Sequence, residues 1–304
     1  MRVTLGMMSD HVRSSLMTSS ERLLDAQEQA ASGKRIRRPS DDVPGTGRSL
    51  NLRSALASLE QYGDNAAIAK TQLSVTTSTL DSVIRELQEV RRLAVQAANS
   101  SLDEAALGGI ASQLDSISTE LAGLANTQSL GKYIFSGSMT NTATLAPSAS
   151  GDPPYDYQGD SAQFQIQVSQ GVRITANVTG DVVFNLNGAG VPGSSDVFAC
   201  IKALKENVLA GDTAAISAQI AEIDANLGNV NAVRSQVGGR LNRLEAAEQS
   251  LLDANVRVAT LLSETEDVDL AEATIALRTQ EIVYQAALSA ASRILEISLG
   301  NYLR

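Results

Sequence analysis

Apolar positions recur at alternating steps of three and four along most of the chain, the spacing of helices that pack lengthwise. Such a seam predicts a helix within residues 50–100, and a second seam predicts a helix over 107–124. The seam positions are Leu73, Thr76, Leu80, Val83, Leu87, Val90, Ala94 and Ala97, then Leu107, Ile110, Leu114, Ile117, Leu121 and Leu124. Because residues 99–103 interrupt the pattern only briefly, the two helices are expected to form an antiparallel hairpin.

The same spacing returns in the second half of the chain. A short helix is expected from Asp196, and a very long one over 213–264. Arg234 and Glu248 interrupt the long seam, whose apolar members are Ile216, Ile220, Ile223, Leu227, Val230, Val237, Leu241, Leu244 and Leu251. A helical glycine costs about 1 kcal/mol relative to alanine. The three glycines of this segment, Gly228, Gly238 and Gly239, are therefore expected to allow close packing or to mark a bend.

Between the helical halves, residues 133–195 show the alternation of β-strands. Phe164–Val168 and Val172–Val178 alternate around Gln170-Gly171 and predict a hairpin. A further strand is expected at Val182–Phe184 after a turn. The Thr-, Ser-, Ala- and Pro-rich stretch 139–154 predicts an exposed loop.

Both ends of the chain are predicted to be helical, and each helix has more apolar surface than a single packed seam would bury. Residues 1–31 have a heptad-like seam, and residues 268–304 carry apolar side chains on more than one face. We expect the two terminal helices to pair and to polymerise with neighbouring subunits by a contact that does not close. The candidate interface residues are Leu5, Met8, Val12, Leu16, Leu23, Val283, Ala287, Ala290, Ile294 and Ile297.

The additional apolar surface of the C-terminal helix has two interpretations. The tail either docks into the core of its own chain or is covered by neighbours. We favour the second, in which Ala287, Ala290, Ile294 and Ile297 are buried only in the polymer and are disordered in the free subunit. The predicted fold class is mainly α, a coiled-coil bundle of long antiparallel helices with a small inserted β domain. The predicted domains are 1–45 with 265–304, 46–132 with 196–264, and 133–195.

A basic loop follows the first helix. Gly33 is a plausible helix stop, Pro39 prevents continuation, and Ser40 or Asp41 can cap the next helix. Lys34, Arg35, Arg37 and Arg38 face Asp41 and Asp42 across Pro39. In so acidic a chain, a local ion-pair loop is a better interpretation of these charges than a nucleic-acid patch.

The composition of the chain argues against several classes of function. The formal charge of −10 argues against nucleic acid as a partner, because neutralising phosphates needs an excess of Lys and Arg. No stretch approaches the roughly 20 apolar residues that span a bilayer, and the N-terminus lacks the apolar core of a secretory signal. Composition by itself therefore predicts a soluble, cytoplasmic protein without a membrane partner.

Candidate chemistry is sparse. Residues 188–193 match the dinucleotide pattern G-x-G-x-x-G, but helix rather than a βαβ unit follows it, so a loop is expected. A nucleophile pair would need Cys200 and His11, which we expect to be a packed thiol and a polar-face histidine. Carboxylates at 264, 266, 267 and 269 are expected at helix ends. No enzyme, cofactor or metal site is predicted.

Several motifs together resemble the flagellin superfamily. The loop Ser32-Gly33-Lys34-Arg35-Ile36 followed by Pro39-Ser40-Asp41-Asp42 is similar to its hallmark, in the version typical of the hook–filament junction branch. Residues 91–99, 126–137, 155–160, 237–245 and 268–304 resemble further family segments, so the resemblance covers nearly the whole chain.

The resemblance implies a structural subunit between the hook and the filament of a bacterial flagellum. It implies self-assembly into a ring, with another hook-associated junction protein, flagellin and a flagellar export chaperone as partners. It also implies export by the flagellar type III apparatus, which replaces the cytoplasmic expectation. A filament-forming flagellin is the alternative, and a cytoplasmic enzyme or coiled-coil scaffold is the third hypothesis.

Overall fold

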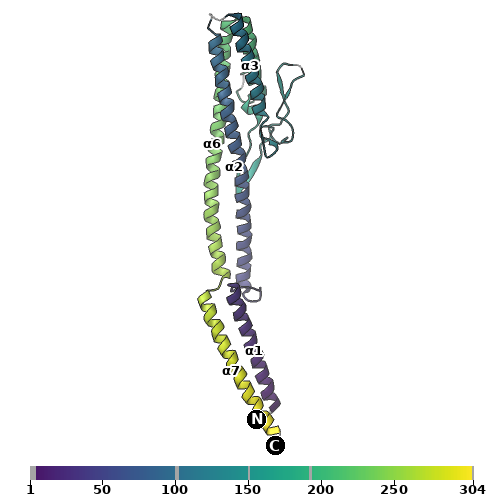
Figure 1. Cartoon of the computed structure of the whole chain (residues 1–304), viewed down its shortest axis with the longest axis vertical. Coiled ribbons are helices and arrows are strands. Elements are labelled where there is room, and N and C mark those ends of the chain that lie inside the picture. Colours follow the sequence, from purple (N-terminus) through teal and green to yellow (C-terminus); the bar gives the residue numbers. More distant parts are fainter. Residues whose placement is uncertain (1–4, 100–102, 150, 192–193, 303–304) are drawn as a thin grey trace. The chain divides into compact units, whose positions relative to one another are not determined.

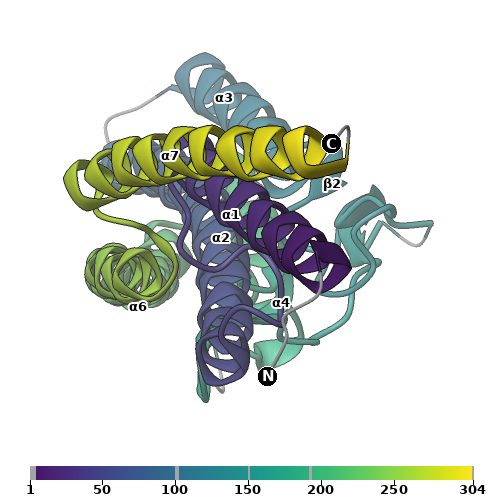
Figure 2. The same ribbon diagram turned by 90° about the horizontal axis from the view of Figure 1, so that it is seen from below.

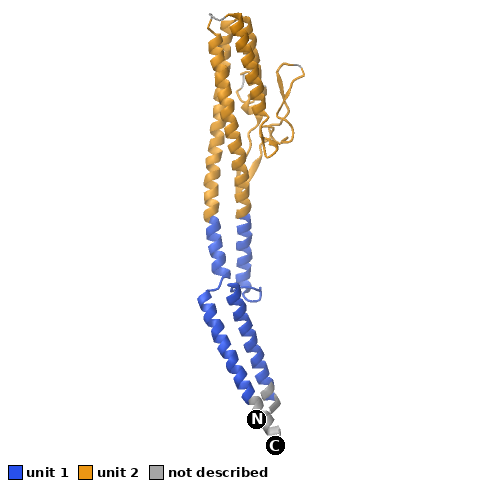
Figure 3. Ribbon diagram, in the orientation of Figure 1, with its two compact units in different colours: residues 1–58, 254–304 blue, residues 59–253 orange. Residues whose placement is uncertain are grey.

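The computed structural model describes residues 5–99, 103–149, 151–191 and 194–302, although side chains are not described at every helical position near the two ends. The chain divides into two compact units (Figure 3). The terminal unit contains residues 1–58 and 254–304, and the long-helix unit contains residues 59–253. The three-part domain division remains a prediction.

Four helices supply most of the core of the long-helix unit. They are α2 (Val43–Ala97), α3 (Glu104–Ala125), α5 (Val197–Ala210) and α6 (Thr213–Glu266), and α2, α3 and α6 run lengthwise in Figure 1. The seam of α2 is buried at every predicted position, from Leu73 to Ala97. Most predicted seam residues of α3 and α6 are buried in the same core, which confirms the helical prediction.

The two charged interruptions of the α6 seam make ion pairs with α2. Arg234 Nε lies 2.5 Å from Asp81 Oδ1, and Glu248 Oε2 lies 2.7 Å from Lys70 Nζ. Arg91 and Asp224 form a third bridge between the same helices. The residue numbers rise on α2 as they fall on α6, so the three bridges mark one antiparallel register.

The β region forms three separate two-stranded antiparallel sheets. These are β1 (Gln128–Ser129) with β2 (Lys132–Tyr133), β3 (Leu145–Pro147) with β4 (Tyr155–Tyr157), and β5 (Gln165–Ser169) with β6 (Val172–Thr175). The predicted hairpin at 164–178 is present, although β6 ends at Thr175. The exposed-loop prediction for 139–154 is wrong in part, because this stretch contains β3 and the buried Leu145.

The predicted strand at Val182–Phe184 is wrong. Gly180–Val183 forms the short helix α4, followed by a 3₁₀ turn at Leu186–Gly188. Phe184 is fully buried, with its ring centroid 5.8 Å from that of Phe135 and 5.7 Å from that of Phe198. A helical turn places this aromatic side chain in the core, and that packing outweighs the local strand preference of the sequence.

The helical glycines of α6 do not provide close packing within the chain. A Cβ atom added at Gly228, Gly238 or Gly239 would meet no atom within 4 Å, apart from the backbone of the helix itself. The helix continues unbroken through all three positions. The expectation of close packing is therefore wrong for contacts inside this subunit.

In the terminal unit, α1 (Leu5–Ser32) lies beside α7 (Leu270–Tyr302), as Figures 1 and 2 both show. This confirms the predicted pairing of the terminal helices. Within the described residues, no helix combines the length and apolarity needed to cross a membrane.

Candidate assembly site

The α1–α7 pair packs through small side chains. Ser19 and Ala26 of α1 and Ala273 and Ala291 of α7 are buried, with exposed fractions of 4–9 %. The larger seam residues Val12, Leu16, Leu23, Leu277 and Tyr284 are only half-buried. Small residues let two helices approach closely but bury little apolar area, so this seam contributes less stabilisation than a leucine-rich one.

Large apolar side chains lie on the outside of the pair. On α7, Ile275 and Ile282 are each 67 % exposed and, seven residues apart, share one face of the helix. On α1, Met17 and Leu24 are 58 % and 54 % exposed and are also seven residues apart. Each helix therefore has one apolar row in the seam and another directed to solvent.

The loop between α1 and α2 is built from turns and caps. Gly33 ends α1 with a φ of +67°, a left-handed conformation that favours glycine. Asp42, and not Ser40 or Asp41 as predicted, caps α2, because its Oδ1 accepts from Gly45 N at 2.8 Å. Asp41 instead accepts from the backbone N–H groups of Arg37 and Arg38. These backbone bonds lower the pKa of Asp41, and the Gly45 bond, helped by Arg35, lowers the pKa of Asp42.

The basic residues of the loop do form ion pairs, but only Arg35 pairs with a predicted partner. Its Nη1 lies 3.2 Å from Asp42 Oδ2. Arg37 and Arg38 reach back to α1, where Glu28 pairs with both and Asp25 with Arg37. The prediction of an ion-pair loop is therefore correct in kind, although most of the partners are different.

Glu266, the last residue of α6, lies at the centre of a charged cluster, with its side chain 2 % exposed. Its carboxylate accepts from Ser49 Oγ and from Arg53 Nη2 at 2.8 Å, and lies 3.5 Å from Lys34 Nζ. Burial opposes ionisation of this carboxyl, but the hydrogen bonds from Arg53 and Ser49 outweigh it and lower the pKa of Glu266. The next residue, Asp267, bridges Lys34 at 2.5 Å.

Backbone hydrogen bonds strengthen this cluster. Glu266 O accepts from Arg35 N at 2.6 Å, and Val268 N donates to Gly33 O at 3.0 Å. Asp269 then caps α7 by accepting from Ala271 N at 2.8 Å. The basic loop, the end of α6 and the start of α7 are thus tied together. Sequence reasoning placed Glu266 at a helix end but missed its partners Ser49 and Arg53, because nothing in the spacing relates residues more than 200 positions apart.

The predicted interface residues fall into three groups. Val12, Leu16, Leu23 and Ala287 are half-buried, whereas Val283 and Ala290 are exposed. The side chains of Leu5, Met8, Ile294 and Ile297 lie outside the described residues. The expected disorder of the tail is not what the structure shows, because α7 is helical to Tyr302. Ala287 is already partly covered within the subunit. Pairing with α1 supplies the tertiary packing that a lone helix lacks.

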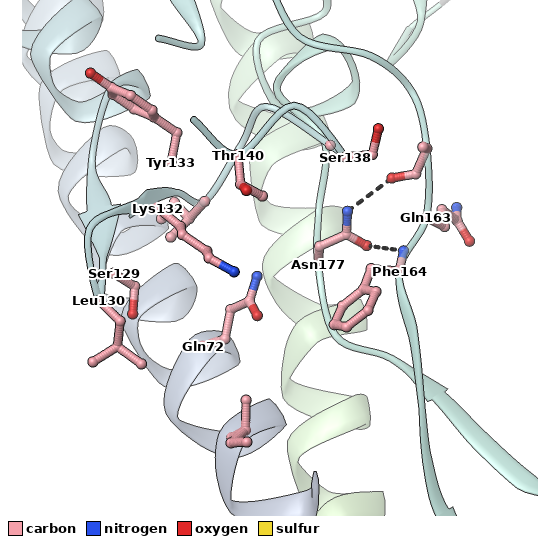
Figure 4. A pocket seen from close by; sticks show the side chains of 14 residues that line it. Gln72, Ser129, Leu130, Lys132, Tyr133, Ser138, Thr140, Gln163, Phe164 and Asn177 are labelled. Atoms are coloured by element: carbon pink, nitrogen blue, oxygen red, sulfur yellow. Dashed lines mark hydrogen bonds between the residues drawn. The ribbon is translucent and has the colours of Figure 1, made fainter. Parts of the chain in front are cut away.

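The long-helix unit contains a cavity of about 460 Å³ beside β1 and β2 (Figure 4). Ile68, Tyr133 and Phe164 line it together with the polar side chains of Gln72, Lys132 and Asn177. Asn177 is engaged, since it accepts from Phe164 N and donates to Ala162 O. This lining offers amides, hydroxyls and one ammonium group, but no nucleophile paired with a base.

Other candidate chemistry is equally limited. Cys200 is buried, which raises the pKa of its thiol to about 12, and His11 is exposed. The described part of the G-x-G-x-x-G stretch begins at the end of a 3₁₀ turn and is held by Asn185, whose Oδ1 accepts from Gly190 N and Val191 N, while residues 192–193 lie outside the described residues. Among described residues, no group of three His, Cys, Asp or Glu side chains could hold a metal ion.

Comparison with known proteins identifies the family. The bacterial flagellin N-terminal helical region matches residues 3–140, and the bacterial flagellin C-terminal helical region matches residues 220–303. The chain belongs to the flagellin family. The two matched regions include both terminal helices, the basic loop and the Glu266 cluster, so the candidate assembly site lies within the family's shared helical parts.

Individual relatives come from two branches of the flagellin family. Flagellar hook-associated protein 3 of Escherichia coli K12 is 26 % identical, with 98 % of each chain covered. Flagellin of Bacillus subtilis is 27 % identical over 86 % of this chain and 85 % of its own. The structure of a flagellar hook-associated protein from Vibrio parahaemolyticus is 27 % identical, with a TM-score of 0.67, and covers 75 % of this chain and 100 % of its own.

These relationships make the protein a structural component of the extracellular bacterial flagellum. As a member of the flagellin family it assembles with other flagellar proteins. The paired terminal helices and the charged cluster beside them are the features of this subunit that we take up as its candidate assembly site.

Proposed function

We propose that this chain is the junction subunit between the flagellar hook and the filament and that it polymerises through α1 and α7. The observation that carries the proposal is the double apolar surface of the helix pair. Ile275, Ile282, Met17 and Leu24 remain exposed after α1 and α7 have packed together. Exposed apolar rows on a structural subunit are surfaces for its neighbours.

The proposed interface changes the sequence prediction, because Val12, Leu16, Leu23 and Ala287 are half-buried and are left out of the interface. It comprises the outward rows together with Val283 and Ala290, and it continues to Leu5, Met8, Ile294 and Ile297 near the two ends. Neighbouring copies would cover these residues, and a ring of copies would present one edge to the other hook-associated junction protein and one to flagellin. Export by the flagellar type III apparatus and an export chaperone belong to the same proposal, and no enzymatic activity does.

A truncation separates assembly from folding. Removing residues 283–304 should leave the long-helix unit folded, since its core lies within residues 66–244, yet should abolish attachment of filaments to hooks. Circular dichroism and cooperative melting of the purified truncated chain would check the first expectation. Electron microscopy of cells that carry only this variant would check the second. Loss of most helical signal in the truncated monomer would contradict the proposal.

A filament-forming flagellin is the second candidate, because the Bacillus subtilis relative is a flagellin of similar identity and coverage. The two functions differ in copy number. Quantifying the protein in sheared flagella decides between them, and an abundance equal to that of the main filament subunit would contradict the junction function. Finding the protein only inside motile cells would contradict both and favour a cytoplasmic scaffold or enzyme.

A further inference from the structure

The Glu266 carboxylate connects segments that are far apart in the sequence. It contacts Lys34 in the basic loop and both Ser49 and Arg53 on α2, while its own backbone carbonyl accepts from Arg35 N. Helix α7 begins four residues later. A single side chain thus lies where α1, α2, α6 and α7 end or begin.

The cluster places one hydroxyl and two cations around a buried carboxylate. Ser49 and Arg53 direct O–H and N–H donors at its two oxygens, and Lys34 adds a third donor. The two cations are about half exposed, with exposed side-chain fractions of 43 % for Lys34 and 59 % for Arg53, whereas Glu266 is 2 % exposed. The buried carboxylate of Glu266 is therefore the centre of the cluster, and the partly exposed Lys34 and Arg53 bind to it. A glutamine has the same shape, and its amide nitrogen could face the Ser49 hydroxyl, which can also accept, but it lacks the negative charge that pairs with Lys34 and Arg53.

We propose that Glu266 is a positioning residue for assembly, which holds the basic loop and the start of α7 on the ends of α2 and α6 so that the α1–α7 pair is presented to neighbouring subunits in one arrangement. This inference rests on the proposed function and deepens it. Among the described side chains, the seam of α1 and α7 buries no large apolar residue, so the polar cluster at its base supplies the constraint on its placement.

Three variants separate charge from shape in the full-length chain. Glu266→Gln keeps the shape and removes the charge, whereas Glu266→Asp keeps the charge and shortens the side chain. Glu264→Gln is the matched control, because Glu264 is exposed, lies two residues away and loses the same charge. Each variant is measured for amide hydrogen exchange as a purified subunit, and for filament attachment in cells lacking their own copy.

We expect Glu266→Gln to exchange about tenfold faster than the wild type in α7 and the basic loop, since hydrogen bonds to a buried charge are lost. Residues 59–253 should exchange as in the wild type. Filament attachment should fall by about the same factor, with Glu266→Asp intermediate and Glu264→Gln unchanged. A side chain that merely filled space would give the opposite order, in which Glu266→Gln is tolerated and Glu266→Asp is not.

Two results would overturn the inference. One is wild-type exchange in Glu266→Gln, and the other is wild-type filament attachment despite faster exchange. If Glu266→Gln fails to accumulate, the pair Ser49→Ala and Ser49→Thr replaces it, with loss expected in the first and rescue by the second hydroxyl. If the proposed junction function were wrong, the wild-type chain itself would be absent from the hook–filament junction. That result does not depend on the Glu266 variants and is therefore distinguishable from failure of this inference.

Discussion

The two units of this subunit use the same helical periodicity with different side chains. In the long-helix unit, Leu73, Leu80 and Leu114 are completely buried, and the core is continuous from α2 through α3 and α5 to α6. In the terminal unit, the buried seam positions of α1 and α7 with described side chains are Ser and Ala, while Ile275 and Ile282 are exposed. The first unit buries its apolar surface within the subunit, and the second leaves much of it for other molecules.

The ion pairs of the two units also differ in how deeply their side chains are buried. The bridges of the long-helix unit, such as Asp81–Arg234 and Lys70–Glu248, join side chains that are all substantially exposed. Exposed pairs contribute little stability, so these bridges specify register more than they stabilise. In the terminal unit, the buried Glu266 carries the charge cluster. The terminal unit therefore combines a seam that buries little apolar area with a charged cluster around a buried carboxylate.

The largest effect should come from deleting a buried leucine. We expect Leu80→Ala in the long-helix unit to lower the free energy of unfolding by about 2–5 kcal/mol, because it leaves a cavity in a packed core. Leu24→Ala in the terminal unit is the matched change at a 54 % exposed position and should stay within about 0.5 kcal/mol. Urea unfolding followed by circular dichroism measures both. Equal losses would show that the two units do not differ in packing as described.

Gly45 tests how tightly the basic loop is packed. An added Cβ would lie 2.3 Å from Asp42 Oδ2 and 2.6 Å from Ile36 Cδ1. We expect Gly45→Ala to destabilise the terminal unit by about 1–3 kcal/mol, since the Asp42 cap must move. Gly47→Ala is the control in the same helix, where a Cβ meets no atom within 4 Å, and should stabilise by up to about 1 kcal/mol. Amide exchange in residues 33–48 would reveal both changes. A stabilised Gly45→Ala variant would contradict the packing.

The sequence predicted the helices better than the contacts at their ends. Steps of three and four were enough to locate the buried faces of α2 and α6, because periodicity determines which face of a helix is apolar. The same rule could not find Glu266, whose partners Lys34 and Arg53 depend on how distant segments meet. It also failed at Phe184, where the packing of three aromatic rings determines the local conformation.

Acid should weaken the terminal unit before the long-helix unit. In the terminal unit, the pKa values of Glu266 and Asp267 are lowered, Glu266 from 4.5 against the cost of burial and Asp267 from 3.8 by Lys34 and Ser263. A lowered carboxyl pKa contributes stability above the unfolded-state value, which is lost as pH falls through the folded value. In the long-helix unit, burial raises the pKa values of Glu86 and Asp196, whose protonation favours folding. This offsets part of the acid loss from Glu89, Asp160 and Glu222, whose pKa values are lowered by hydrogen bonds.

Hydrogen exchange at pH 6 and at about pH 3.5, corrected for intrinsic rates, measures this difference, since protection reports local opening. We expect protection in α7 and the basic loop to fall first, and Glu266→Gln to show a weaker dependence on pH. Lys34 behaves in the opposite way at high pH. Its pKa is raised by Asp267, so its contribution to the stability of the terminal unit is lost only as pH rises through that raised value. Simultaneous loss of protection in both units would contradict the prediction.

Leu130 gives the smallest predicted effect and shows that the contrast between the units is not absolute. It lies in the tight β1–β2 turn with a φ of +53°, and its side chain is 87 % exposed. Leucine is sterically disfavoured in this left-handed conformation, which asparagine tolerates, and gains no burial in return. Leu130→Asn should therefore raise the free energy of unfolding of the long-helix unit by up to about 1 kcal/mol.

Leu209→Asn is the comparison for that substitution, because Leu209 is also exposed, at 56 %, but lies in α5 with ordinary helical geometry. There asparagine is the poorer residue, so stability should fall by a few tenths of a kcal/mol, roughly the difference in helix propensity. Thermal unfolding of the two variants side by side tests the turn conformation directly. If both substitutions destabilise, backbone strain at Leu130 is not what governs its effect, and burial of its side chain within the subunit must contribute instead.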